Sequence, residues 1–371
     1  MNILILSNGY GEDGVGSKLV DTINKKSKNR NNFYVMPIVG SGDIYKKNDN
    51  VNLLACNKVF KCSGFLRSFK YLLNDIKNGL IGYHLKQIRE LQKLNKKIKF
   101  DEITAVGDFF LVLISLFISK RRIYFLPTAK SDYFQKHLWI EKIIMKMKCK
   151  KVFPRDELTH NSFKNYGISS QYLGNVLMDT IEDENDDKIN FSNEEYKILI
   201  LPGSREEVYE NLKIIKNIIK EFNIIAEGKS KKVSYYISLH NSLHESKVYE
   251  IYGDVKVTVL KGKFKTLVEN ADIVLGLSGS ANEQALGMGK PVVAFDGYEP
   301  NITKKRFLEQ KKLLGDGLIY VEGNPSKIAN VIYNVLNNNN YLAEIKEKAK
   351  IFMGTTGAIN KIAEIILNEN I

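Results

Sequence analysis

Residues 3–20 read ILILSNGYGEDGVGSKLV, and they decide the first structural interpretation of the chain. The apolar run 3–6 leads into a glycine-rich turn, and a helical pattern follows the turn. A strand, a tight turn and a helix in this order begin the repeating units of parallel α/β proteins. Because the same alternation continues along the whole chain, we expect an α/β fold with two Rossmann-like, doubly wound domains.

The apolar runs that predict strands are short and continuous, as is typical of strands covered on both faces. They lie at 2–7, 33–39, 102–107, 122–127, 151–154, 197–202, 233–239, 255–260, 272–277, 291–295 and 317–321. An acidic, polar segment at 179–196 has no apolar periodicity, which is typical of a linker. We therefore expect domains over 1–178 and 195–350, and a final segment, 351–371, whose helix packs back on the first domain.

The composition is that of a globular chain long enough for two domains, with 371 residues, 44% hydrophobic and 26% charged. No signal-peptide pattern is evident, and the apolar stretch 109–118 is too short for a spanning helix, which needs roughly 20 residues. Cys56, Cys62 and Cys149 lack metal-binding spacing and predict reduced thiols. A cytoplasmic location is expected.

The charge is distributed unevenly. Residues 1–175 hold 30 Lys and Arg against 14 Asp and Glu, a net charge of +16, whereas the remainder has a net charge of −3. A basic half favours an anionic partner such as phospholipid, a phosphorylated substrate or nucleic acid. The alternative is a chain that is rich in lysine for reasons unrelated to a partner.

The turn at 9–14 has the spacing G-x-G-x-x-G, which also occurs in dinucleotide-binding proteins. Two carboxylates, Glu12 and Asp13, lie inside it and would repel a diphosphate, and no acid follows at the spacing that a ribose requires. We instead expect Gly9 and Gly11 to bring backbone close to a polar acceptor, with Glu12 and Asp13 accepting hydrogen bonds from its hydroxyls. The alternative is a plain turn in which Asp13 caps the helix.

A second strand–turn–helix unit, KILILPGSREEVYENLKIIKNII, occupies 197–219. In its turn, Gly203 permits close approach of a ligand, Ser204 offers a hydroxyl and Arg205 a planar cation. The turn is therefore a candidate phosphate site. Alternatively, Ser204 only caps the helix and Arg205 is a surface residue.

A third unit, DIVLGLSGSANEQALGMGKPVVAF, occupies 272–295. Small residues at the start of a helix leave backbone N–H groups and the positive end of the helix dipole available to an anion. Glu283 lies in the first helical turn, where its carboxylate can accept both hydroxyls of a ribose. The residues expected to hold the phosphates are Ser278, Gly279, Ser280 and Ala281.

This third unit resembles the sugar-nucleotide site of GT-B glycosyltransferases and of UDP-N-acetylglucosamine 2-epimerases. Together with LPGSRE at 201–206 and RDELTHNSFKNYGISSQYLGNVLMD at 155–179, it resembles the lipid-A-disaccharide synthase family, in particular its synthase-related branch. The resemblance implies a GT-B fold with two domains facing across a cleft, a UDP-sugar substrate, and Gly203 and Arg205 beside the diphosphate. Gly279 and Glu283 are four residues apart, a spacing closer to the epimerases than to the synthases.

Glycosyl transfer needs a base for the acceptor hydroxyl and stabilisation of the departing diphosphate. Asp108 lies at the end of the strand 102–107, and the family has a catalytic aspartate in a similar Asp-Phe context. Asp108 could equally cap the helix that follows it, and Glu12 and Asp13 are the rival bases. His240, at the end of another strand, is a weaker candidate. Side chains that could contact the acceptor follow the strand 122–127, namely Lys130, Ser131 and Asp132.

The segments 66–94 and 139–151 place apolar residues at helical spacing with lysines and arginines between them. Such helices can lie on an anionic bilayer, although ordinary core helices with a solvated face show the same pattern. We expect a metal-independent, inverting transferase, without a cofactor, that acts on a UDP-sugar and a lipid-linked acceptor at the inner face of the cytoplasmic membrane. The alternatives are a 2-epimerase and a non-catalytic polyanion binder, and no nucleic-acid-binding motif favours the latter.

Overall fold

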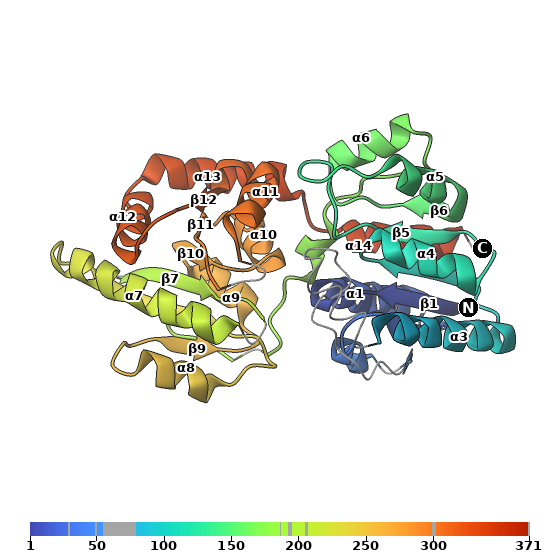
Figure 1. The fold of residues 1–371 in the computed structure, drawn as a ribbon, viewed down its shortest axis with the longest axis horizontal. Coiled ribbons are helices and arrows are strands. Elements are labelled where there is room, and N and C mark those ends of the chain that lie inside the picture. The colour runs from blue at the N-terminus through green and yellow to red at the C-terminus, as the bar shows by residue number, and fades with distance from the viewer. Residues whose placement is uncertain are drawn as a thin grey trace. The chain divides into compact units, whose positions relative to one another are not determined.

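The structure is a computed structural model that describes residues 1–28, 30–48, 50–54, 79–185, 187–191, 195–204, 207–298 and 302–369. The chain forms two compact units. Unit 1 comprises residues 1–180 and 355–371, and unit 2 comprises residues 181–354. Each unit is built around one six-stranded parallel sheet (Figure 1).

The sheet of unit 1 has the strand order β3-β2-β1-β4-β5-β6. Its strands are β1 (Asn2–Ser7), β2 (Asn32–Pro37), β3 (Val51–Leu53), β4 (Glu102–Val106), β5 (Ile123–Leu126) and β6 (Cys149–Val152). The helical elements of this unit are α1 (Tyr10–Ser27), η1 (Asp43–Lys47), α3 (Leu80–Ile98), α4 (Phe109–Ile118), α5 (Trp139–Lys148), α6 (Glu157–Asn165), η2 (Val176–Thr180) and α14 (Ala358–Asn368).

Alternation along the strands gives unit 1 two apolar layers, one on each face of the sheet. Ile3 and Ile5 of β1 pack in one layer with residues of α1 and α14, whereas Leu4 and Leu6 pack in the other with residues of α3, α4 and α5. All four side chains are fully buried. Burial of such a side chain stabilises the fold by about 1.5–3 kcal/mol.

The sheet of unit 2 has the order β12-β11-β10-β7-β8-β9. Its strands are β7 (Glu195–Leu201), β8 (Lys232–Ser238), β9 (Thr258–Leu260), β10 (Ile273–Gly276), β11 (Val292–Ala294) and β12 (Leu318–Tyr320). The helical elements are α7 (Val208–Glu227), α8 (Glu245–Tyr252), α9 (Phe264–Asn270), α10 (Ser280–Gly287), α11 (Lys304–Leu314), η3 (Gly315–Gly317), α12 (Pro325–Leu336) and α13 (Asn339–Met353).

Both sheets follow the Rossmann-like order 3-2-1-4-5-6 when their strands are counted along the chain. The predicted pair of doubly wound domains is therefore confirmed. In such a sheet the order reverses beside the first strand, and the loops there diverge to leave a crevice at the carboxyl ends of two strands. This switch point lies between β1 and β4 in unit 1, and between β7 and β10 in unit 2.

The end of the chain returns to unit 1, where α14 packs beside α1 (Figure 1). The carboxylate of Asp179 accepts hydrogen bonds from the backbone N–H groups of Gly357 (2.5 Å) and Ile359 (2.6 Å). Two charge-assisted hydrogen bonds of this kind at the start of a helix stabilise that start. Unit 1 is therefore assembled from two separate stretches of sequence.

The segment expected to be a linker, 179–196, is bound to the units at both of its described ends. Asp179 holds α14, while the side chain of Asp183 accepts hydrogen bonds from the backbone and hydroxyl of Thr266. The Glu184 N–H donates to the Gly262 carbonyl oxygen at 2.8 Å. The passage from unit 1 to unit 2 is therefore short, between residues 180 and 181.

Some local predictions differ from the structure. The strand β3 was not predicted, because the exposed, polar Asn52 interrupts the apolar pattern of Val51–Leu53. The helix expected at 139–151 ends at Lys148, since Cys149–Val152 pairs with β5. The part of the expected helix before residue 79 lies outside the described residues, as do Cys56 and Cys62, whereas Cys149 is a free, buried thiol.

Candidate functional site

The switch point of unit 1 gathers polar side chains from the ends of β1 and β4. Asn8 follows β1, and Asp108 follows β4 after Gly107. The Asp108 backbone N–H donates to the Asn8 Oδ1 atom at 3.3 Å, so the two loops are joined directly. The Asp108 carboxylate is also the cap of α4, because it accepts a hydrogen bond from the Phe110 N–H at 2.9 Å.

The Asp108 carboxyl titrates far above its usual range. Burial raises its pKa to about 7, and the negative charges of Glu12 and Glu141 act in the same direction. The Phe110 N–H and the Asn8 side chain oppose this rise because they stabilise the ionised form. A carboxyl with a pKa near 7 is a much stronger proton acceptor than an ordinary aspartate.

Asp13 is bound internally. Its Oδ1 atom accepts a hydrogen bond from the Ser7 hydroxyl at 2.5 Å, and the Tyr45 hydroxyl donates to Ser7 Oγ at 3.0 Å. The side chain is buried, and desolvation raises its pKa to about 7. Asp13 thus closes a buried hydrogen-bond chain between β1, α1 and η1, rather than presenting its carboxylate at the surface.

The glycine motif at 9–14 is not an open loop, because α1 begins at Tyr10 and Gly11 and Gly14 are helical. Gly9 is the residue before the helix, and a Cβ atom there would lie 2.4 Å from the Glu12 Oε2 atom. The half-buried Glu12 carboxylate therefore lies over the Gly9 backbone. This arrangement differs from a dinucleotide turn, in which the corresponding space takes a diphosphate.

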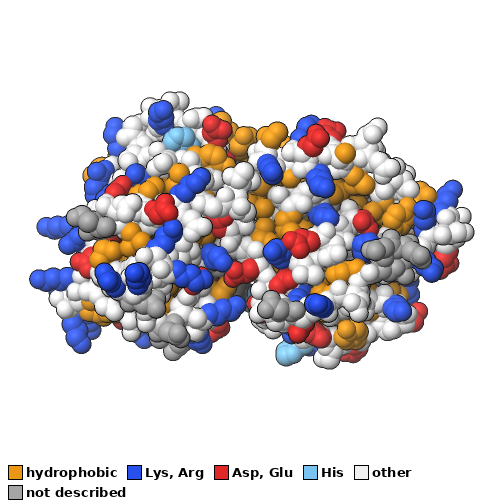
Figure 2. All heavy atoms as spheres, turned by 180° about the vertical axis from the view of Figure 1, so that it is seen from behind, with side chains coloured by type: hydrophobic (Ala, Val, Ile, Leu, Met, Phe, Trp, Pro, Cys, Tyr) orange, Lys and Arg blue, Asp and Glu red, His pale blue; other side chains and the backbone are white. Residues whose placement is uncertain are grey.

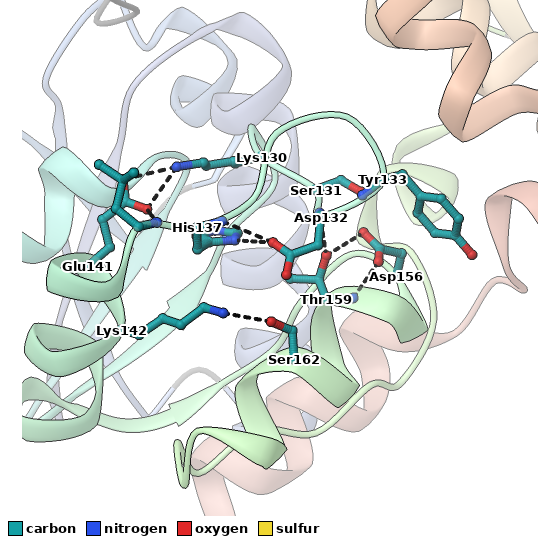
Figure 3. A network of polar contacts seen from close by, with 11 residues as sticks. Lys130, Ser131, Asp132, Tyr133, His137, Glu141, Lys142, Asp156, Thr159 and Ser162 are labelled. Atoms are coloured by element: carbon teal, nitrogen blue, oxygen red, sulfur yellow. Dashed lines mark hydrogen bonds and ion pairs between the residues drawn. The ribbon is translucent and has the colours of Figure 1, made fainter.

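The loop after β5 holds Lys130, Ser131 and Asp132 in a polar network (Figure 3). The Lys130 ammonium pairs with both Glu141 carboxylate oxygens, at 2.8 and 3.1 Å. Asp132 accepts hydrogen bonds from the backbone N–H of His137 (3.1 Å) and contacts its Nδ1 atom (2.9 Å). These contacts hold the pKa of Asp132 at about 2, against the effect of burial.

The switch point of unit 2 brings together the turns after β7 and β10. Gly203 has a positive φ of 107°, and a Cβ atom there would lie 3.8 Å from the Leu277 carbonyl oxygen. Ser204 follows Gly203, whereas Arg205 lies outside the described residues. The predicted phosphate turn and the predicted helix start therefore lie next to each other.

Ser278, Gly279, Ser280 and Ala281 form the turn and the start of α10. Gly279 precedes the helix, and no side chain in the described parts of the chain caps it. The first N–H groups of a helix have no partner inside it, and they carry the positive end of its dipole. The start of α10 therefore has the chemistry of an anion site.

Two buried side chains fix this turn. Asn282 is fully buried, donates to the Gly276 carbonyl at 3.1 Å and accepts from the Ser278 N–H at 3.4 Å. Gln310 of α11 donates to the Gly279 carbonyl at 2.8 Å and lies 3.5 Å from the Glu283 Oε1 atom. Glu283 is thereby oriented in a buried position in the first turn of α10.

Arg306, also on α11, lies against the same turn. A Cβ atom on Gly279 would be 2.5 Å from the Arg306 Nη2 atom, which shows how closely the guanidinium covers the start of α10. Four of these residues were not predicted from the sequence, namely Asn8, Asn282, Arg306 and Gln310. Asn8 could have been noticed because it follows a strand directly, but no signal in the α11 sequence indicates that Arg306 reaches α10.

His240, the remaining candidate, follows β8 and its Nδ1 atom lies 2.8 Å from the Ser242 hydroxyl. Burial lowers the pKa of His240, which favours the neutral imidazole. Among the described residues, no three His, Cys, Asp or Glu side chains gather as a metal site would require.

Part of the chain is similar in sequence to a known family. Residues 153–299 match the sequence model of the lipid-A-disaccharide synthetase family. Lipid-A-disaccharide synthase 2 of Legionella pneumophila (strain Philadelphia 1) is 25% identical over 224 residues, which are 53% of this chain and 55% of that protein. The chain thus spans about half the length of the curated relative that it matches.

Two solved structures resemble the whole chain. The UDP-GlcNAc 2-epimerase from Neisseria meningitidis, bound to UDP-GlcNAc, has a TM-score of 0.58 and 15% identity, covering 99% of each chain. The glycotransferase of kitacinnamycin has a TM-score of 0.66 and 10% identity, covering 100% of this chain and 99% of that one. The chain therefore has the GT-B fold, and its predicted resemblance to the lipid-A-disaccharide synthase family is confirmed over residues 153–299.

Proposed function

We propose that this protein is a glycosyltransferase that moves a sugar, of the N-acetylglucosamine type, from a UDP-sugar to a lipid-linked acceptor. The observation that carries the proposal is the start of α10, where a turn of small residues, a buried Glu283 and the Arg306 guanidinium converge. A diphosphate needs N–H donors and positive charge, and a ribose needs a carboxylate that accepts from two hydroxyls. The turn offers all three.

In this proposal the diphosphate binds Ser278, Gly279, Ser280 and Ala281, with Gly203 and Ser204 on its other side. Arg205, which the sequence also predicts beside the diphosphate, lies outside the described residues. Arg306 supplies positive charge, and its position at the turn is described by the structure. Glu283 binds the ribose, while Gln310 keeps its carboxylate in place. These donors stabilise the charge that develops on the departing UDP, so the proposed mechanism does not require a metal ion.

Asp108 is the proposed base. It accepts the proton of the acceptor hydroxyl while the hydroxyl oxygen forms a bond to the anomeric carbon and the bond from that carbon to the UDP oxygen breaks. A single displacement of this kind inverts the anomeric centre. The raised pKa of about 7 suits a group that must take a proton near neutral pH. Glu12 and Asp13 are the alternatives, and internal hydrogen bonding makes Asp13 the less suitable of the two.

The acceptor is proposed to lie along Gly9, Gly11 and the loop after β5. In that loop the contacts of Asp132 fix the backbone, so that Lys130 and Ser131 have defined positions (Figure 3). In this loop the Lys130 ammonium, which is paired with Glu141, is the proposed contact to the polar headgroup of a lipid-linked sugar, whereas Ser131 is fully buried and supports the loop. Such a headgroup also suits the basic character of unit 1.

We further propose that the protein associates with the inner face of the cytoplasmic membrane. Leu138, Trp139 and Ile140 are exposed at the start of α5, and Ile81 and Leu85 are exposed at the start of α3. Both helices pack beside α4, whose start carries Asp108. Figure 2 shows Lys and Arg side chains interspersed with apolar ones over unit 1, at the left of that view. No helix in the described ranges has the length and apolarity to span a bilayer.

The test is a comparison of ligands by thermal shift, followed by transfer assays with UDP-N-acetylglucosamine and glycolipid acceptors in vesicles. UDP is expected to raise the melting temperature, whereas NAD is not. Release of UDP should require an acceptor lipid. Stabilisation by NAD, or the absence of any UDP effect, would contradict the donor site.

A UDP-N-acetylglucosamine 2-epimerase is the second candidate, favoured by the four-residue spacing of Gly279 and Glu283 and by the fold of the epimerase from N. meningitidis. An epimerase inverts C2 of UDP-N-acetylglucosamine without any acceptor. Proton NMR of that substrate incubated with the protein in deuterated buffer distinguishes the two functions, because only epimerisation exchanges the C2 hydrogen.

A further inference from the structure

Asn8 is a buried side chain whose hydrogen-bonding capacity is only partly used. It is 4% exposed and lies directly after β1, at the switch point of unit 1. Its Oδ1 atom accepts from the Asp108 N–H at 3.3 Å, whereas its buried Nδ2 atom has no hydrogen-bond partner among the residues that the structure describes. A buried amide donor without a partner costs free energy, so its retention requires an explanation.

Gly107 makes room for this amide. It has a positive φ of 148°, and a Cβ atom there would lie 1.8 Å from the Asn8 Oδ1 atom and 2.8 Å from its Cγ atom. A side chain at position 107 would therefore displace the Asn8 amide. Glycine at position 107, directly before Asp108, therefore leaves free the space that the Asn8 amide occupies.

The surroundings of the Asp108 carboxyl show what the amide contributes. Glu12 of α1 and Glu141 of α5 disfavour the ionised form, and Lys130 beside them is paired with Glu141. On α3, the His84 ring packs against Phe110, the second residue of α4. The groups that favour ionised Asp108 are the Phe110 N–H and the Asn8 side chain.

We propose that Asn8 is a positioning residue for Asp108. Its Oδ1 atom fixes the Asp108 backbone, and its Nδ2 atom is the donor that turns to the Asp108 carboxylate when that group is ionised. In this arrangement the Asn8 Nδ2 donor stabilises the ionised Asp108 carboxylate, which is the form that can act as a base. This inference rests on the proposed function, in which Asp108 takes the proton of the acceptor hydroxyl, but the interaction itself can be measured without catalysis.

The experiment is a titration of Asp108 by carbon-13 NMR of protein labelled at aspartate carboxyls, with Asp108→Asn used to assign the signal. In Asn8→Ala the pKa of Asp108 should rise by about half a unit or more, because a donor to the charged form is lost. Gly107→Ala should produce the same rise by displacing the amide, and it provides a second route should Asn8→Ala fail to fold.

Thr104→Val is the matched control. Thr104 lies in β4 and is fully buried, and within the described ranges its Oγ1 atom has no hydrogen-bond partner and makes no hydrogen bond to Asp108. Its removal should leave the Asp108 titration unchanged. An unchanged Asp108 pKa in folded Asn8→Ala and Gly107→Ala would overturn the proposal, as would an equal rise in Thr104→Val.

Activity separates this inference from the proposed function. With a glycolipid acceptor, the acidic limb of the pH–rate profile in Asn8→Ala should move up by the same amount as the NMR titration. A raised Asp108 pKa without transfer activity in the wild-type protein would support the Asn8 contact and contradict the proposed function. If the Asp108 pKa rises in Asn8→Ala but the acidic limb of the pH–rate profile does not move, this result would contradict the role of Asp108 as the base.

Discussion

The switch point of unit 1 is lined by carboxylates and an amide, whereas the switch point of unit 2 is lined by small residues, a helix start and an arginine. Both lie beside the first strand of a sheet with the same strand order. In unit 1 the helix after β4 is capped by its own acid, Asp108, which accepts a hydrogen bond from the Phe110 N–H at the helix start. In unit 2 Gly279 precedes the helix after β10, and no side chain in the described part of the chain caps that helix.

From this difference we infer that the common scaffold sets where a ligand can bind, and we propose that the residue before each helix sets the sign of the charge that the site accepts. A capping carboxylate makes the first switch point suitable for handling protons. A glycine cap makes the second suitable for holding phosphate. Substitutions can test this division between proton transfer at the first switch point and phosphate binding at the second.

Replacing Asp108 by Asn should have the largest effect, because it removes the proposed base without changing the size of the side chain. We expect transfer to fall by about 10²- to 10⁴-fold, while the thermal shift caused by UDP stays unchanged. Initial rates and melting curves measure the two effects. Loss of the UDP effect in Asp108→Asn would contradict the separation between the two switch points.

Asp13→Asn tests how the buried carboxyl of Asp13 makes the stability of unit 1 depend on pH. The folded-state pKa of Asp13 is about 7, above its value in an unfolded chain, so its contribution to stability is complete below pH 3.8 and is lost as the pH rises through 7. The neutral variant does not suffer this loss. Relative to wild type it should gain stability between pH 4 and 7.5, by at most about 4 kcal/mol.

Urea titrations of both proteins across this pH range measure the difference. Asp21→Asn on the outer part of α1 is the control, because Asp21 pairs at the surface with Lys25. A stability difference between Asp13→Asn and wild type that does not vary with pH would show that Asp13 does not titrate in this range.

Arg306→Gln tests the positive side of the comparison. Loss of a charge-assisted contact with the diphosphate should weaken UDP binding at least about tenfold. Glu283→Ala should weaken uridine binding similarly, but should leave the affinity for inorganic diphosphate unchanged. Isothermal titration calorimetry measures both, with Lys305→Gln, an exposed neighbour on α11, as the control.

Trp139→Ser should have the smallest effect and concerns the surface around the first switch point. Trp139 is 67% exposed at the start of α5, and its removal should reduce binding to vesicles containing anionic phospholipid a few-fold. Met147→Ser is the matched control, because Met147 is 71% exposed near the other end of the same helix. Equal losses in a sedimentation assay would contradict a docking surface at the start of α5.

The sequence was sufficient for most of the fold, because buried parallel strands leave continuous apolar runs whose positions are easily read. It did not reveal β3, since the polar Asn52 at the centre of this strand leaves no continuous apolar run, whereas the equally short edge strands β9 and β12 lie within longer apolar runs. Nor could it decide between base and cap for Asp108. The structure shows the cap, and the same carboxylate still has a pKa near 7, so a cap and a raised pKa coexist.

The candidate site was only partly accessible to sequence reasoning. Residues that follow a strand directly, such as Asp108 and Ser278, could be identified from local pattern. Arg306 and Gln310 could not, because they reach Gly279 from a helix that follows the next strand, and only the packing of α11 on α10 brings them there. Contacts between elements distant in sequence leave no local signal.

The return of α14 to unit 1 has a consequence for how the chain is made. Unit 2 is continuous in sequence, whereas the apolar layer under α1 in unit 1 is completed only by Ile359, Ile362 and Ile366. Once residues 1–354 have been synthesised, every residue of unit 2 is present. One face of unit 1 is then still without α14. We therefore expect unit 2 to be able to complete its fold during synthesis before α14 covers the open face of unit 1.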